Sequence, residues 1–166
     1  STTKYMDGHA TQVGGCVVDS GRFDWMAHAE KFPGLCTPDE SYHGLTYAKD
    51  FGEMGYTTKL VAQLMRDLGS IPAPQNSFLL NLGLETLALR MERHCANAQK
   101  VAEFLVSHPA VEKVYYPGLI DHPGHDIARR QMSDFGGMLS FEVKGGREAG
   151  AKLVNALHLI RSLIHI

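Results

Sequence analysis

Apolar residues recur three or four positions apart along the stretch from Gly83 to Ser107. This spacing places them on one face of an α-helix, so the pattern predicts a single long helix with an apolar stripe. Its length of about 25 residues exceeds the roughly 8 to 20 residues of most globular helices, and we expect it to run from one domain into the next. The stripe consists of Leu84, Leu87, Ala88, Met91, Cys95, Ala98, Val101, Ala102 and Leu105.

Two further stretches have the same helical spacing. Apolar residues within 56–68 form one face, and Gly69 is expected to end that helix because glycine readily adopts the left-handed conformation of a helix end. We expect Pro72 and Pro74 to keep the following segment extended. The stretch 147–160 predicts a last amphipathic helix.

Three short runs predict β-strands. The run 13–19 is apolar and follows a polar turn, which favours a short buried strand, whereas 111–116 alternates between apolar and polar residues. A third strand is expected at 137–143, after the polar, His-rich stretch 121–126 and a short helix. Strands that alternate with helices at this density predict an α/β fold.

Composition and charge narrow the classes of partner. The 166 residues carry a net charge of −2, and Lys and Arg are scattered along the chain rather than clustered. This charge pattern disfavours binding to nucleic acid or an anionic membrane, and no apolar run reaches the roughly 18 residues of a membrane span. Cys16, Cys36 and Cys95 are far apart, a pattern typical of reduced thiols, so we expect a cytoplasmic protein whose partners are small molecules or other chains.

The clearest candidate chemistry lies at the start of the chain. If the segment is extended, the hydroxyls of Ser1 and Thr3 point to one side and can bind one phosphate, with Lys4 next to them. A lysine amine bonds covalently to an aldehyde cofactor. Alone, such a motif is far more often a surface lysine beside hydroxyl residues. The residues that follow change this balance: Tyr5, Gly8-His9 and Gly14-Gly15 before an apolar run.

This order of residues resembles the cofactor-lysine signature of the Cys/Met metabolism family of pyridoxal-phosphate (PLP) enzymes. Other blocks resemble the same family in the same order, from Ser1 to Gly146. The stretch 81–94 is similar to its interdomain helix, 114–119 with His122-Pro123 to its next strand and turn, and 135–141 to the strand after that.

Within the family, the stretch 21–45 is similar to O-acetylhomoserine sulfhydrylases, because cystathionine lyases and synthases are shorter here. Arg66-Asp67-Leu68-Gly69 and 83–87 fit the same branch. The resemblance therefore implies a PLP-dependent transferase of methionine biosynthesis. Its reaction is γ-replacement on O-acetylhomoserine with sulfide or a thiol, which gives homocysteine or methionine.

The resemblance also implies the architecture. A type I PLP fold, like that of aspartate aminotransferase, has a cofactor domain followed by a small α/β C-terminal domain, and a long helix joins the two. Residues 1–92 would be the end of the cofactor domain and 93–166 an incomplete C-terminal domain. Because the chain opens without an initiator methionine, we expect an N-terminal half to be missing. The resemblance also implies protein partners, namely other segments or subunits of the same enzyme. These would form a homotetramer built from dimers that share active sites.

For the site, the resemblance implies that Lys4 carries PLP and acts as the catalytic base, and that Ser1 and Thr3 bind the phosphate. The family's other cofactor groups lie upstream of this lysine, and its substrate-carboxylate arginine lies downstream of where the sequence stops. The family also has a glycine-containing loop that is absent after Ile160, so that Ile160-Arg161 either spans a missing loop or begins a divergent end. We expect the chain alone to be inactive.

Several alternatives remain open from the sequence. His9 is expected to support the loop rather than to act directly. His122 and His125, in an Asp-flanked turn, favour an exposed turn over a metal site, and no metal is expected. Rival activities within the family are cystathionine γ-synthase and cystathionine or methionine γ-lyase. A rival of another class is an inactive structural piece that completes a larger assembly.

Overall fold

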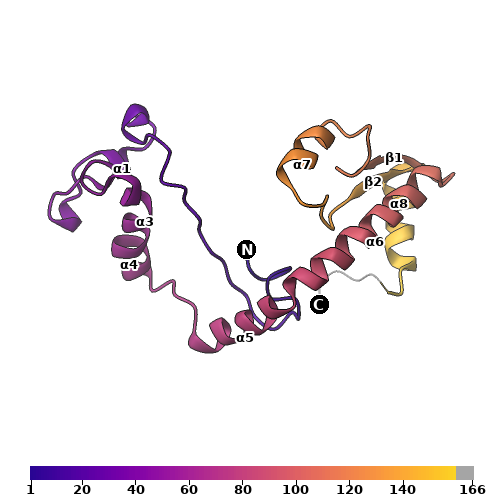
Figure 1. The fold of residues 1–166 in the computed structure, drawn as a ribbon, viewed down its shortest axis with the longest axis horizontal. Helices are drawn as coiled ribbons and strands as arrows, with labels where there is room; N and C mark the ends of the chain where they lie inside the picture. The colour runs from indigo at the N-terminus through magenta and orange to yellow at the C-terminus, as the bar shows by residue number, and fades with distance from the viewer. Residues whose placement is uncertain (160–166) are drawn as a thin grey trace. The chain divides into compact units, whose positions relative to one another are not determined.

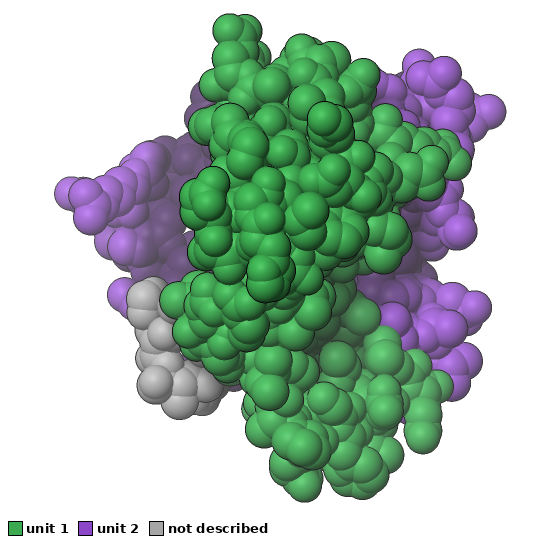
Figure 2. Space-filling model, turned by 90° about the vertical axis from the view of Figure 1, so that its left-hand side faces the viewer, with its two compact units in different colours: residues 1–85 green, residues 86–166 purple. Residues whose placement is uncertain are grey.

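The computed structural model describes residues 1–159 of the chain. These residues belong to two compact units, Ser1–Glu85 and Thr86–Ile166, which Figure 2 colours separately. Each unit is described by itself. The domain boundary expected at Glu92 stays a prediction, since it refers to the domains of a complete type I fold.

Unit 1 contains helices and loops, and within its residues the structure has no β-strand. The first four α-helices are short and lie close together in sequence (Figure 1). A 3₁₀ turn at Met26–His28 precedes them, and two more, at Glu40–Tyr42 and Gly52–Met54, lie between them. A longer helix ends the unit. The helices are α1 (Pro33–Cys36), α2 (Tyr47–Asp50), α3 (Gly55–Lys59), a π-helical segment η4 (Leu60–Met65), α4 (Arg66–Leu68) and α5 (Pro74–Glu85).

The helix expected at 56–68 is confirmed as the continuous series α3, η4 and α4. Gly69 ends it in the left-handed conformation, with φ of 67°, and its N–H donates to the Met65 carbonyl over 2.8 Å. This series packs near a small core in which Leu35, Cys36 and Tyr47 are buried together with Ala48. Aromatic side chains cover that core: Trp25, Phe32, Tyr42, Phe51 and Tyr56.

The buried strand expected at 13–19 is wrong for this chain. The segment is extended but pairs with no strand (Figure 1), and Val13 and Val18 are 80% and 89% exposed. An apolar run forms a buried strand only where neighbouring strands accept its backbone hydrogen bonds and cover its faces. Unit 1 contains no such neighbour among its residues.

The single long helix expected at 83–107 is also wrong. The structure has α5, which begins at Pro74, and α6 (Leu87–Ser107), separated by Thr86 with φ of −105° and ψ of 2°. Proline fits the first turn of a helix, so Pro74 opens α5 instead of holding the chain extended. The Thr86 side chain makes no cap hydrogen bond, and a one-residue break hardly disturbs the apolar spacing that predicted one helix.

Unit 2 packs α6 against a two-stranded antiparallel sheet. The strands are β1 (Val111–Tyr115) and β2 (Ser140–Val143), with Tyr115 opposite Ser140. Ala98 and Ala102 of α6 and Tyr116 after β1 form the buried core, and the Tyr116 hydroxyl donates to the Gly136 carbonyl over 2.9 Å. Helices α7 (His125–Gln131) and α8 (Gly146–Ala156) complete the unit.

The strands and helices expected in unit 2 are confirmed, but some begin or end at other residues than expected. Both strands form, although β2 begins three residues after the expected start at Gly137, and α8 ends at Ala156. The expectations for Ile160-Arg161 lie outside the described residues. The fold class is a mixture of helices and strands, and none of the helices within 1–159 is long and apolar enough to cross a membrane.

Candidate functional site around Lys4

Lys4 lies on a loop that its own backbone closes. At the base of the loop, the Thr2 N–H donates to the Gly14 carbonyl over 2.9 Å. At its tip, the Asp7 N–H donates to the Thr2 carbonyl over 3.0 Å and the Gly8 N–H to the Lys4 carbonyl over 2.8 Å. The Lys4 side chain is exposed on this tight turn. The fold thus presents an amine to solvent from a backbone that is held at both ends.

The hydroxyls of Ser1 and Thr3 differ in what they can still bind. Thr3 Oγ1 donates to the Gly14 carbonyl over 3.3 Å and accepts from the Gly14 N–H over 3.1 Å. Ser1 Oγ accepts from the Thr3 N–H over 3.3 Å. A hydroxyl has one proton to donate and two lone pairs to accept. The proton of the Ser1 hydroxyl therefore remains available for a further acceptor, whereas the Thr3 proton is used at the base of the loop.

Asp7 is a fully buried carboxylate in the same loop, 0% exposed. Its Oδ2 accepts from the Thr11 N–H over 2.9 Å and from the His9 N–H over 3.3 Å, and its Oδ1 accepts from the Thr11 hydroxyl over 2.8 Å. The backbone N–H of Thr11, followed by the hydroxyl of Thr11 and the N–H of His9, holds the pKa of Asp7 below its ordinary value. Asp7 therefore remains charged while it organises the chain that follows Lys4.

His9 is exposed, and its Nδ1 lies 3.0 Å from the Asp7 carbonyl oxygen. A neutral His9 that donates through Nδ1 leaves Nε2 as an acceptor. The ring thus caps the turn and faces solvent, in agreement with a supporting role.

Gly83 of α5 makes the closest approach to this loop. It is buried, and a β-carbon added there would lie 2.5 Å from the Met6 carbonyl oxygen and 2.7 Å from the Asp7 carbonyl carbon. These distances are far shorter than a van der Waals contact, so only glycine allows the loop backbone to lie on the helix. Gly83 belongs to the block that resembles the family, but the pattern of residues does not reveal what it contacts.

These residues suit PLP by their chemistry. An exposed amine on a fixed turn can bond to an aldehyde, and a hydroxyl with a free proton can donate to a phosphate. Sequence reasoning predicts these three groups, Lys4, Ser1 and Thr3, and their roles stay predictions. It missed Asp7 and Thr11, because an Asp four residues before a Thr has no distinctive spacing, and it missed Gly83, because its role depends on a contact with the distant backbone of Met6 and Asp7.

The His-rich turn of unit 2 has a structural use for its imidazoles. The His122 ring accepts from the Gly124 N–H over 3.1 Å, and His125 Nδ1 lies 2.7 Å from the Pro117 carbonyl oxygen. Within residues 1–159, no three His, Cys, Asp or Glu side chains come close enough to hold a metal ion.

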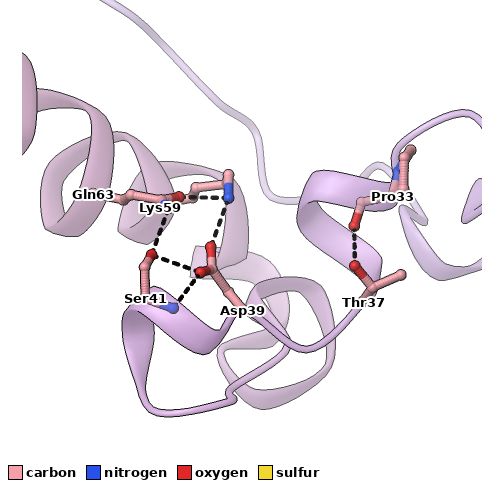
Figure 3. Close-up of polar contacts among 6 residues, drawn as sticks. All are labelled: Pro33, Thr37, Asp39, Ser41, Lys59 and Gln63. Carbon is pink, nitrogen blue, oxygen red and sulfur yellow. Dashed lines mark hydrogen bonds and ion pairs between the residues drawn. The ribbon is translucent and has the colours of Figure 1, made fainter.

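A second polar cluster in unit 1 joins segments that lie far apart in sequence (Figure 3). Lys59 Nζ lies 3.1 Å from Asp39 Oδ2 and 2.6 Å from Gln63 Oε1. Ser41 closes the ring, since its hydroxyl donates to Asp39 over 2.6 Å and accepts from Gln63 over 2.8 Å. The ammonium also lies 4.6 Å from the centre of the Tyr47 ring. Because these groups satisfy one another, we assign the cluster a structural role.

This cluster predicts acid sensitivity. The Ser41 hydroxyl, and then Lys59, hold the pKa of Asp39 below its ordinary 3.8. A carboxylate with a lowered pKa stabilises the folded chain above its unfolded pKa, and this stabilisation is lost as the pH falls through the folded pKa. We expect acid below about pH 4 to loosen the helices around Asp39, and Asp39→Asn to flatten that dependence. Fluorescence of Trp25, the single tryptophan, which stacks on Tyr56, reports the change.

Asp121→Asn is the matched control for this titration, because Asp121 is an exposed carboxylate of the other unit. We expect its acid transition to follow that of the wild type. Identical transitions for Asp39→Asn and the wild type would contradict the role of the cluster.

Comparison with known proteins identifies the family of the chain. The family model for Cys/Met metabolism PLP-dependent enzymes matches residues 1–165. The chain is 43% identical to a homocysteine synthase from Schizosaccharomyces pombe over its whole length. It is 42% identical to an L-methionine gamma-lyase from Fusobacterium nucleatum subsp. polymorphum over 96% of its length. The chain spans 39% of the length of the first relative and 32% of the second.

A solved structure is similar in fold as well as in sequence. It is a putative O-acetylhomoserine (thiol)-lyase from Campylobacter jejuni, which contains a pyridoxyl-lysine monophosphate residue. The match has a TM-score of 0.77 and 36% identity, and it covers 98% of this chain and 39% of the other. PLP is thus the cofactor of these proteins, and the chain belongs to the Cys/Met metabolism PLP-dependent enzyme family.

Proposed function

We propose that the protein containing this chain performs γ-replacement on O-acetylhomoserine. Sulfide or a thiol forms a bond to Cγ of the substrate, acetate leaves from Cγ, and the proton of the thiol balances the acetate. The product is homocysteine with sulfide and methionine with methanethiol. The observation that carries the proposal is the match of 98–100% of the chain, at 36–43% identity, to proteins named homocysteine synthase and putative O-acetylhomoserine (thiol)-lyase.

In this proposal Lys4 bonds to the cofactor through its amine. Bound PLP supplies an aldehyde and an electron sink. When it is not bonded to the cofactor, the Lys4 amine would remove and return protons at Cα and Cβ of the substrate. The free hydroxyl proton of Ser1 donates to the phosphate, and Thr3 contributes through its contact with the base of the loop.

The remaining parts of the site come from other segments or subunits. We propose a cytoplasmic homotetramer built from dimers that share active sites. Within each chain, the boundary between the two domains lies near Glu92. The chain spans 39% of its homocysteine synthase relative, which supports a site completed by further polypeptide.

A second candidate is γ-elimination. It is favoured by the match to an L-methionine gamma-lyase at 42% identity over 96% of the chain. Elimination and replacement share every step up to loss of the group from Cγ. They differ in whether a thiol or water completes the reaction.

One assay separates the two candidates. The full-length protein is incubated with PLP, O-acetylhomoserine and sulfide, and homocysteine is measured against 2-oxobutanoate. We expect homocysteine to exceed 2-oxobutanoate by at least about tenfold, because a site built for a thiol favours its addition over elimination. In a parallel incubation, methionine replaces O-acetylhomoserine and sulfide. Formation of 2-oxobutanoate there at a rate similar to that of homocysteine formation would instead support the lyase. The absence of both homocysteine and 2-oxobutanoate would contradict the proposed function.

A further inference from the structure

The buried carboxylate of Asp7 is the strongest polar anchor of the Lys4 loop. It accepts three hydrogen bonds, at 2.8, 2.9 and 3.3 Å, and all three donors belong to Thr11 and His9. Hydrogen bonds to a charged group are stronger than those between neutral groups, and a buried carboxylate without donors is costly. The chain from Asp7 to Thr11 is therefore tied into one rigid turn.

This turn includes a residue whose conformation needs support. Ala10 has φ of 56°, in the left-handed region that a residue with a β-carbon rarely adopts. It lies between the two residues that donate to Asp7. The three hydrogen bonds to Asp7 thus hold Ala10 in a backbone conformation that alanine by itself disfavours.

The same turn rests on α5. The carbonyls of Met6 and Asp7 lie against Gly83 without room for a β-carbon. On its other side, the Asp7 N–H is bonded to the Thr2 carbonyl at 3.0 Å, and the Gly8 N–H to the Lys4 carbonyl at 2.8 Å. Asp7 consequently connects the helix surface to the backbone of Lys4 itself.

We propose that Asp7 is a positioning residue for Lys4: its hydrogen bonds to Thr11 and His9 hold the turn on α5, and the turn holds the amine where the cofactor aldehyde arrives. The inference rests on the proposed function for the role of Lys4. It assigns Asp7 no contact with substrate or cofactor. A misplacement of about 1 Å in a reacting group slows its reaction by up to about a hundredfold.

The hydrogen bonds carry this role, so Asp7→Asn, which can keep all three of them without the charge, is a matched control. An asparagine oxygen can accept from the N–H groups of Thr11 and His9, and its NH₂ group can donate to the Thr11 hydroxyl, which then acts as the acceptor. Asp7→Ala removes all three bonds. Thr11→Val removes only the hydroxyl bond, at an exposed position where folding is not at risk.

The first measurement is amide hydrogen exchange of the full-length protein without PLP. In Asp7→Ala we expect exchange in the segment 8–11 to be at least about tenfold faster than in the wild type, because three hydrogen bonds are lost together and each contributes about threefold. Exchange in α3 and α6 should be unchanged, which checks that the fold is intact. Thr11→Val should give a smaller increase of about threefold, and Asp7→Asn little or none.

The second measurement is the rate at which PLP and borohydride leave a pyridoxyl adduct on Lys4, mapped by mass spectrometry. We expect the rate to fall about tenfold or more in Asp7→Ala and to stay within about threefold of the wild type in Asp7→Asn. Wild-type exchange and labelling in Asp7→Ala would overturn the proposal. So would faster exchange without slower labelling, or an Asp7→Asn variant as slow as Asp7→Ala.

The two measurements separate this inference from the proposed function. A wild-type protein without any adduct on Lys4 contradicts the proposed function. In that case, faster exchange at 8–11 in Asp7→Ala still supports the anchoring of the turn, and unchanged exchange overturns it.

Discussion

Lys4→Ala is expected to abolish the pyridoxyl adduct and to lower the rate of γ-replacement by about three orders of magnitude or more. The variant loses both the amine that bonds to the cofactor and the base that moves protons. Lys4→Arg should be equally inactive although it keeps the positive charge. A guanidinium stays protonated at any working pH and does not bond to an aldehyde under these conditions. The adduct is measured by borohydride reduction and peptide mapping, and the rate by release of homocysteine.

Lys49→Ala is the control for this experiment. Lys49 is an exposed lysine of α2 in the same unit, and only its backbone N–H has a described hydrogen bond, to the Thr46 carbonyl. We expect it to retain wild-type labelling and activity. An adduct on another lysine in the Lys4 variant, with activity kept, would show that Lys4 is not the residue that carries the cofactor.

Gly83→Ala is expected to destabilise unit 1 and to displace the Lys4 loop. Alanine favours a helix over glycine by about 1 kcal/mol, but here its β-carbon would meet the Met6 and Asp7 backbone at 2.5 and 2.7 Å. Rigid backbone cannot rotate away as a flexible side chain can. We expect a net loss of about 2 kcal/mol in the free energy of unfolding, the middle of the usual range for overpacking, together with faster exchange at 8–11.

Gly150→Ala provides the matched comparison. Gly150 lies within α8, and the nearest atom to an added β-carbon is a Val143 methyl at 4.0 Å, an ordinary contact. The same substitution should therefore stabilise the protein by about 0.5 to 1 kcal/mol. Denaturant unfolding measures both variants. Equal effects of the two substitutions would contradict the close approach of the loop to α5.

The residues of the candidate site were accessible from the sequence to different extents. Lys4, Ser1 and Thr3 could be named because an amine and two hydroxyls lie within four positions and the blocks that follow them resemble the family's cofactor-lysine signature. Asp7 could not, because its three donors give no pattern along the chain and its burial depends on α5. The roles of Ser1 and Thr3 stay predictions, but the geometry distinguishes them, since Gly14 uses the hydroxyl proton of Thr3 and leaves that of Ser1.

By itself, the sequence determined the features that depend on neighbouring residues. The helix at 56–68 ends at Gly69 as expected, and both strands of unit 2 form, because apolar periodicity and turn residues act over a few positions. Tertiary structure decided whether an apolar run has neighbours, as at Val13 and Val18, which stay exposed without a strand partner. It also decided where two distant segments touch. The approach of Asp7 to Gly83 depends on how the loop folds back over a span of 76 positions, for which periodicity contains no signal.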